Sequence, residues 1–237
     1  MMILEQRDVL QADETALLAD WHARWHEKHA NYQWFNEDGI VDYERWAALP
    51  DGKHILILLK ETNGLHGSLT DFLRNGGSQT YWRTWNNAAR WANLILNGTY
   101  WKFVSRAELD DMVRNIAVVN LKKYAGGARA NRKEVLNEAS KDIDLLKRQI
   151  TLYEPEIILT GGWNLVSDFL HDTIFEDTAA WNRPNDVTQL WYYETTQITP
   201  NHKTLVVSMP HPNRAAKRWT LELEKVLRAT DRICYEK

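Results

Sequence analysis

Three side chains capable of acid–base or charge-stabilising chemistry stand beside short apolar runs of this 237-residue chain. They are Glu61 after residues 54–60, Asn120 at the end of residues 115–120, and His211 after residues 204–208. A carboxylate can stabilise a positively charged sugar and orient water, a fixed imidazole can hold negative charge on a leaving group, and an amide can read a base edge. The set fits cleavage of an N-glycosidic bond, which builds positive charge on the sugar and negative charge on the departing base.

The turn around His211 is stiffened by two prolines. Pro210 and Pro212 restrict their own φ angles and the residues before them, so the imidazole is presented from a rigid loop. Arg214 and Lys217 follow at the start of a predicted helix. A solvated face is the usual place for such charges, but their position beside the proposed site favours contacts with phosphate.

Hydrophobic patterning predicts the elements that position these groups. Four short runs that are apolar on both faces predict buried parallel strands at residues 54–60, 115–120, 156–160 and 204–208. Helical patterns separate them at residues 81–96, 106–113, 133–152, 163–171 and 214–229. This alternation predicts an α/β fold, a three-layer αβα sandwich with a central, mainly parallel four-stranded sheet, to which residues 188–197 add an edge strand. The carboxyl ends of parallel strands meet at one rim, where ligands bind.

The first 50 residues are expected to form a helical extension that packs on a single domain spanning residues 1–237. Residues 13–31 have the spacing of an amphipathic helix, and a short helix is expected near residues 43–48. Three histidines, His22, His26 and His29, share one face of the longer helix. Their spacing can bind a metal, but we favour a solvated or aromatic-packed face because no carboxylate or cysteine partner accompanies them.

Composition excludes several classes of protein. The single cysteine, Cys234, excludes a disulfide framework and sites built on several thiolates. No run approaches the about 20 apolar residues of a membrane span, and the acidic start does not resemble a secretory signal. We therefore expect a cytoplasmic protein without cofactor or metal, away from membranes, and monomeric. The net charge of −3 neither indicates nor excludes a basic DNA-binding face. The 12 tryptophans favour aromatic core packing, with stacking on bases as the alternative.

Four motifs accompany the predicted strands in order. They read Lys60-Glu61-Thr62-Asn63-Gly64, Val119-Asn120-Leu121-Lys122-Lys123, Glu154-Pro155-Glu156-Ile157-Ile158-Leu159-Thr160-Gly161 and His211-Pro212-Asn213. Over about residues 54–220 their order and spacing resemble the uracil-DNA glycosylase superfamily, chiefly its thermophilic bacterial branch. The matching family motifs are of the types Gly-Glu-Ala-Pro-Gly, Thr-Asn-Val-Val-Lys, Pro-Lys-Val-Ile-Val-Ala-Leu-Gly and His-Pro-Ser.

The resemblance implies a role for each matching residue. Glu61 and His211 would be catalytic. The base would be bound by Asn120, Thr62, Asn63, Phe72 and Tyr81. Apart from the resemblance, basic groups flank the proposed site, one with Lys123 and Arg129 around residues 126–127 and one with Arg214 and Lys217. We expect the phosphates of DNA to lie against Lys123, Gly161, Gly162, Asn213, Arg214 and Lys217. For the glycine pair, amides at a helix N-terminus could hold a phosphate, with a tight strand-to-helix turn as the alternative.

The chain also departs from the family pattern. The iron–sulfur cysteines are absent, and the first motif lacks its Ala-Pro. No Pro-Phe-x-Gly segment is clear, although Phe72, Tyr81 and Trp82 lie in the right region, and Asn213 replaces the usual serine without a following leucine wedge. We therefore expect a monofunctional DNA glycosylase that flips out a modified or damaged pyrimidine and leaves an abasic site. A hypermodified cytosine of phage DNA, attacked in anti-phage defence, would be such a substrate.

Three alternatives stay open. Within the same class, the protein could be an ordinary repair glycosylase that excises uracil from single- or double-stranded DNA. The altered first motif and net acidity would also suit a non-catalytic nucleic-acid-binding module on the same fold. A hydrolase or transferase of free nucleosides or nucleotides would need the same carboxylate and donor but no basic groove. A likeness of fold does not decide among them.

Overall fold

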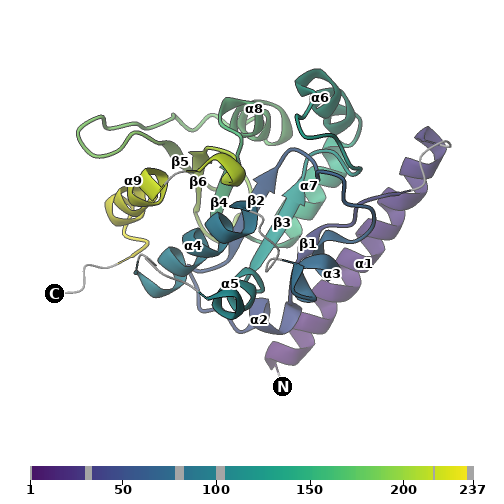
Figure 1. Ribbon diagram of the computed structural model, residues 1–237, viewed down its shortest axis with the longest axis horizontal. Coiled ribbons are helices and arrows are strands. Elements are labelled where there is room, and N and C mark those ends of the chain that lie inside the picture. The colour runs from purple at the N-terminus through teal and green to yellow at the C-terminus, as the bar shows by residue number, and fades with distance from the viewer. Residues whose placement is uncertain (1, 30–33, 78–82, 100–104, 216, 234–237) are drawn as a thin grey trace.

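One sheet lies at the centre of the described chain, with helices around it (Figure 1). The computed structural model describes residues 2–29, 34–77, 83–99, 105–215 and 217–233. Within them the sheet has six strands in the order β1-β3-β2-β4-β6-β5. The expected Tyr81 and Trp82 lie outside the described residues.

The four predicted strands form the parallel centre of this sheet. They are β2 (Ile55–Leu59), β3 (Ile116–Asn120), β4 (Ile157–Gly161) and β6 (Thr204–Met209). Every residue in them is buried, which explains their continuous apolar runs.

Two short edge strands make the sheet larger and more mixed than expected. The strands β1 (Gly39–Ile40) and β5 (Trp191–Thr195) pair antiparallel with β3 and β6. The edge strand expected within residues 188–197 is thus confirmed as β5. The strand β1 was not expected, because a two-residue strand is too short to show a period. The sheet is therefore six-stranded and mixed, not four-stranded.

Alternate residues of β2 face opposite sides of the sheet and meet different helices. Ile55, Ile57 and Leu59 belong to a core with α3 (Leu69–Arg74), α4 (Arg83–Asn97), α5 (Arg106–Val113) and α9 (Lys217–Ala229). Leu56 and Leu58 belong to a second core with α1 (Met2–Lys28), α2 (Tyr43–Ala47), α6 (Arg132–Lys141), α7 (Ile143–Leu152) and α8 (Asn164–Asp168). Helices on both faces are compatible with an α/β sandwich.

Most helix predictions are close, and the differences have local causes. The helix expected at 133–152 breaks at Asp142, whose backbone leaves the helical region at φ −128° and ψ 29°, giving α6 and α7. The helix expected at 163–171 begins as α8 and continues as a π-helix, Phe169–Ile174. A 3₁₀ turn, Pro212–Arg214, precedes α9. The capping box of Ser105 and Glu108 starts α5 as predicted.

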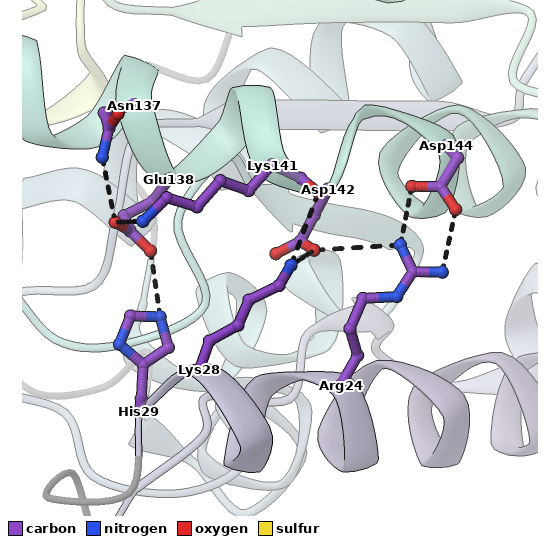
Figure 2. A network of polar contacts seen from close by, with 8 residues as sticks. All are labelled: Arg24, Lys28, His29, Asn137, Glu138, Lys141, Asp142 and Asp144. Atoms are coloured by element: carbon purple, nitrogen blue, oxygen red, sulfur yellow. Dashed lines mark hydrogen bonds and ion pairs between the residues drawn. The ribbon is translucent and has the colours of Figure 1, made fainter.

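The N-terminal helix α1 is the long helix along one side of the molecule (Figure 1). It buries Trp21 and Trp25 in the second core. A polar network ties its last turns to the break between α6 and α7, where Lys28 Nζ lies 2.7 Å from Asp142 Oδ1 and Arg24 pairs with Asp144 (Figure 2). Among the described helices, none has both the length and the apolar character to cross a bilayer.

Candidate functional site

A cavity of about 710 Å³ opens at the carboxyl ends of the parallel strands, and Glu61, Asn120 and His211 all line it. The register of the sheet explains this convergence. Leu59 pairs with Asn120, and Gly161 pairs with Met209, so the strands end at one rim. Three residues that are up to 150 positions apart in the sequence are thereby brought to one site.

Glu61 is held by a buried lysine. Its side chain is only 5% exposed, and a carboxylate oxygen lies 2.5 Å from Lys122 Nζ, whose side chain is 1% exposed. Lys122 also donates to Glu134 at 2.8 Å. Burial alone would lower the pKa of Lys122, but the bonds to Glu134 and Glu61 raise it above its ordinary value. A Cβ at Gly126 would overlap the Glu61 carboxylate. The carboxylate can therefore occupy this position only because residue 126 is a glycine.

Asn120 is held by a buried acid. Its backbone N–H and its side-chain Nδ2 both donate to Asp38 Oδ2, at 2.7 Å and 3.2 Å. A carboxylate only accepts, so the amide nitrogen must face Asp38. The Oδ1 atom is buried and has no hydrogen-bond partner within the described chain. A lone buried acceptor on a residue that lines the cavity is suited to a ligand N–H.

His211 is neutral in this site. The backbone N–H of Asn213 donates to His211 Nδ1 at 3.2 Å, which puts the proton of the neutral ring on Nε2. Burial, with the charges of Lys60 and Arg214, lowers the pKa of His211 to about 4. Near pH 7 the ring is therefore a fixed hydrogen-bond donor through Nε2.

Among the described residues, four basic side chains and one carboxylate, that of Glu61, line the same cavity. They are Lys60 after β2, Arg83 at the start of α4, Arg129 in the loop after β3, and Arg214 after His211. The three arginines are exposed and Lys60 is half-buried. We call these four side chains the basic rim. Their positive charge makes the cavity attractive to anions. Arg129 and Arg214 flank the proposed site in the sequence and were expected here, and Lys60 directly precedes Glu61. Arg83 was missed, because only the fold brings the start of α4 to the strand ends.

In the described part of the chain, the aromatic side chains of Phe72, Trp85 and Trp163 add flat apolar surface to the cavity. Phe72 was predicted and is half-buried. Trp163 was not predicted from the sequence. Its φ angle is positive, 54°, which is strained for a tryptophan. Its ring packs edge-on against that of Trp219, with 4.8 Å between the ring centroids. Tyr81, the other predicted aromatic, lies outside the described residues.

Thr62, Asn63 and Asn213 lie where the sequence placed them, on the cavity. Thr62 is nearly buried, and its hydroxyl donates to Asn36 Oδ1 at 3.2 Å. Asn63 and Asn213 are exposed, and the backbone N–H of Asn213 already donates to His211 Nδ1. These contacts give Thr62 and Asn213 a part in holding the loops that carry Glu61 and His211.

The prediction for Lys123 is wrong. Its side chain is 2% exposed, lies 2.5 Å from Asp38 Oδ1 and donates to Gln149 at 2.9 Å, so it cannot reach a DNA phosphate. A basic residue after a strand is usually solvated. Lys123 is instead buried, because it pairs with Asp38, a buried acid that is far away in the sequence. Lys217 is exposed but does not line the cavity.

The glycine pair serves packing and a tight turn. The amides of Gly162 and Trp163 both donate to Met209 O, at 3.0 Å and 2.9 Å, so neither is open to a phosphate. The helix α8 that follows has only five residues. A Cβ at Gly161 would meet Leu59 and Pro212, which keeps this strand end close to the His211 turn. The turn alternative is the one that the geometry favours.

The three histidines in the last turns of α1 and directly after it pack among aromatic rings. His22 lies 5.3 Å from the Phe35 ring and 4.4 Å from the His26 ring, and His29 pairs with Glu138 at 3.0 Å (Figure 2). In the described part of the chain, no cluster of three or more His, Cys, Asp or Glu side chains is placed to hold a metal ion.

The charged and hydrogen-bonding groups named above come from four places in the chain: the loops after β2 and β6, the end of β3 with the loop that follows it, and the start of α4. Together they offer a paired carboxylate, a lone amide acceptor, a neutral imidazole donor and a basic rim. That arrangement suits a polar, anionic ligand with a flat ring. Neither a scan of protein-family models nor a search of curated proteins finds a match to this chain.

Proposed function

We propose that this protein is a DNA glycosylase that draws a modified or damaged pyrimidine out of the stack and hydrolyses its N-glycosidic bond. The observation that carries the proposal is the common cavity of Glu61, Asn120 and His211. Its volume of about 710 Å³ lies in the range of small-molecule sites. That volume has room for a base together with its deoxyribose. The departures from the uracil-DNA glycosylase motifs, such as the missing Ala-Pro after Glu61, favour a modified base over uracil.

The imidazole of His211 supports the departure of the base. As the glycosidic bond breaks, negative charge grows on the base oxygens, and a neutral Nε2–H can donate to one of them. The Asn213 N–H fixes the tautomer that this requires. A donor that stays in place stabilises this charge without reorganising, which is the usual source of such rate enhancement.

Asn120 supports recognition of the extruded base. Its Oδ1 can accept from a base N–H, and its Nδ2 is already committed to Asp38. A base would therefore present a donor at this position. The N3–H of a uracil-type ring and the exocyclic amine of a cytosine-type ring are both such donors.

Glu61 supports the sugar side of the reaction. A carboxylate can stabilise the positive charge that develops on the sugar and can orient the attacking water. Lys122 keeps the Glu61 carboxylate in one position. The basic rim favours DNA over free nucleosides, because a free nucleoside carries no phosphates for these side chains to bind.

A non-catalytic DNA-binding module is the second candidate function. The buried ion pair between Glu61 and Lys122 favours it, because a carboxylate that is 5% exposed and paired is less free to activate water. Binding without release of a base is what this reading predicts.

Mass spectrometry of released bases tests the proposal. The full chain is incubated with single- and double-stranded DNA that carries uracil or hypermodified cytosines, and with phage DNA. The same assay is run on Glu61→Gln and His211→Ala. The matched control is His202→Ala, since His202 lies at the opposite end of β6 from His211.

We expect a free base and an abasic product from the wild type and from His202→Ala, and strong loss of both products in the other two variants. Binding of DNA with no base released from any member of the panel would favour the second candidate. Release that persists undiminished in both site variants would overturn the assignment of these residues.

A further inference from the structure

One basic side chain of the cavity takes no part in the bond-breaking steps of base release proposed above. Lys60 follows β2 directly and lines the cavity beside Glu61 and His211. Within the described chain its ammonium makes neither a hydrogen bond nor an ion pair, unlike Lys122 and Lys123 nearby. Lys60 is therefore a half-buried amine that stabilises no other described side chain through a hydrogen bond or an ion pair.

The surroundings of Lys60 shift its pKa downward, towards the neutral amine. Burial lowers the pKa of Lys60, and the charge of Arg214 lowers it further, with a smaller part from Arg132. Desolvation and a neighbouring cation are the two means by which lysines become nucleophiles near neutral pH. The negative charge of Glu61 raises the pKa of Lys60 in part, but the carboxylate of Glu61 is paired with Lys122 and not with Lys60.

The side chain of Lys60 lies against the backbone of Gly162. A Cβ at Gly162 would lie 2.7 Å from Lys60 Cε and 3.4 Å from Nζ. The absence of a side chain there lets the lysine lie along the turn after β4. The amine is thus carried by the strand end next to Glu61, within the cavity that also holds His211.

We propose that Lys60 forms an imine with the aldehyde carbon of an abasic deoxyribose, which gives the protein a DNA strand-cleaving lyase activity. The proposal rests on the proposed function in one respect, that the cavity admits a deoxyribose of DNA. It goes beyond it, because base hydrolysis with water as nucleophile needs no amine.

Each step of this reaction balances without an added oxidant or reductant. The Nζ lone pair attacks C1′ of the ring-opened sugar, water leaves, and a C=N bond forms. The imine then acidifies C2′, which loses a proton to water. The C2′–H electron pair becomes the C2′=C3′ bond as the C3′–O bond breaks, and the phosphate leaves with the 3′ strand. Hydrolysis of the unsaturated imine returns the amine of Lys60.

A simpler role for Lys60 would be to hold a phosphate as a cation. Lys60→Arg separates the two roles, because arginine keeps the charge and cannot form the imine under these conditions. Lys60→Met removes both the charge and the nucleophile. Lys147→Arg is the matched control, since Lys147 is an exposed lysine of α7 on the other face of the sheet.

The experiment uses a preformed aldehydic abasic site in a labelled duplex, so it does not depend on which base the protein releases. Full-length wild type and variants are incubated with this DNA and sodium cyanoborohydride, which reduces an imine to a stable crosslink. Crosslinked protein is measured on a denaturing gel, and the modified lysine is located by peptide mass spectrometry. Strand cleavage is measured in parallel without the reductant.

We expect crosslinking at Lys60 and cleavage 3′ to the abasic site in the wild type and in Lys147→Arg. Both Lys60 variants should lose at least about 100-fold of each signal, as is typical when a nucleophile is removed. Absence of a crosslink in the wild type, a crosslink that persists in Lys60→Arg, or a crosslink located at another residue would each overturn the proposal. A wild type that releases bases but does not crosslink would leave the glycosylase standing, and the reverse result would leave the lyase standing alone.

Discussion

Asp38 holds Asn120 from behind the cavity, accepting from its backbone N–H at 2.7 Å and from its amide Nδ2 at 3.2 Å. Asp38 is itself fixed by Lys123 at 2.5 Å and by the amide of Gln149 at 3.1 Å. The chain of contacts continues through Gln149 to the hydroxyl of Tyr153 at 2.9 Å. A buried network therefore decides which atom of Asn120 the cavity presents.

Loss of the Asn120 acceptor should weaken base recognition. Asn120→Ala is expected to lower kcat/KM for base release by about 10–100-fold, the usual effect of one unpaired buried hydrogen bond. The double variant Asp38→Asn/Lys123→Met avoids a buried unpaired charge and frees the amide to rotate. It should keep its fold, as seen by circular dichroism, but discriminate less between bases with and without an N–H at that edge. Unchanged discrimination in both variants would contradict the role given to Oδ1.

The pH dependence of activity should reflect the low pKa of His211. Because that pKa is about 4, the neutral donor persists through pH 6.5, and the acid limb of kcat/KM should show no loss from His211 until the pH approaches 4. The positive charge of Lys60 is one cause of the low value, so Lys60→Met should raise the pKa of His211. Nitrogen-15 NMR of the ring measures this directly, with His211→Ala used to assign the signal. A His211 pKa near its ordinary 6.5 would refute the prediction.

The same shift has a consequence for stability. The folded protein binds its proton at His211 less readily than the unfolded chain does, so this group lowers stability as the pH falls from about 6.5 towards 4. His211→Ala should reduce that part of the acid destabilisation. Urea unfolding at pH 7 and pH 4.5 measures it, with His202→Ala as the comparison.

Glu14 should lower the stability of the fold as the pH rises from about 4.5 to 7. It lies on α1, accepts from the Ile40 N–H at 3.3 Å and from the Tyr153 hydroxyl, and burial raises its pKa to about 7. The folded state favours the protonated acid, so its stabilising contribution is full below about pH 4.5 and is lost as the pH rises to 7. The shift corresponds to about 3 kcal/mol.

The variant Glu14→Gln should remove this dependence. Its free energy of unfolding, compared with that of the wild type, should rise by an amount of that order between pH 4.5 and pH 8. Urea unfolding at the two values gives the comparison. Glu5→Gln, an exposed position of the same helix, is the control and should behave as the wild type does. Equal pH dependence in all three proteins would count against a protonated Glu14.

The basic rim should give DNA binding its salt dependence. Arg129→Gln and Arg214→Gln are each expected to weaken binding of a duplex and to reduce the slope of log Kd against log salt by about 0.9, the effect of one lost phosphate contact. Arg148→Gln on α7 lies away from the cavity and should leave the slope unchanged. Fluorescence anisotropy over a series of salt concentrations measures all four proteins. A slope that is insensitive to both rim substitutions would place the DNA elsewhere.

The sequence by itself determined the strands of the parallel centre and the site that their ends share. Runs such as residues 54–60 are apolar on both faces, so they can be stable only between two layers of helices. Once these strands are parallel, their last residues must meet at one edge. Glu61, Asn120 and His211 therefore came together as the order of the motifs predicted.

Tertiary structure decided what the charges do. Lys122 and Lys123 look like surface residues in the sequence, and each is buried because an acid from a distant segment, Glu61 or Asp38, lies at its ammonium. Lys60 differs from both lysines, because it is half-buried, lies against the backbone of Gly162, and has its pKa lowered by burial and by the charge of Arg214. Local patterns report which faces of a segment are apolar, whereas the position of a buried charge depends on contacts between segments that only the packed fold creates.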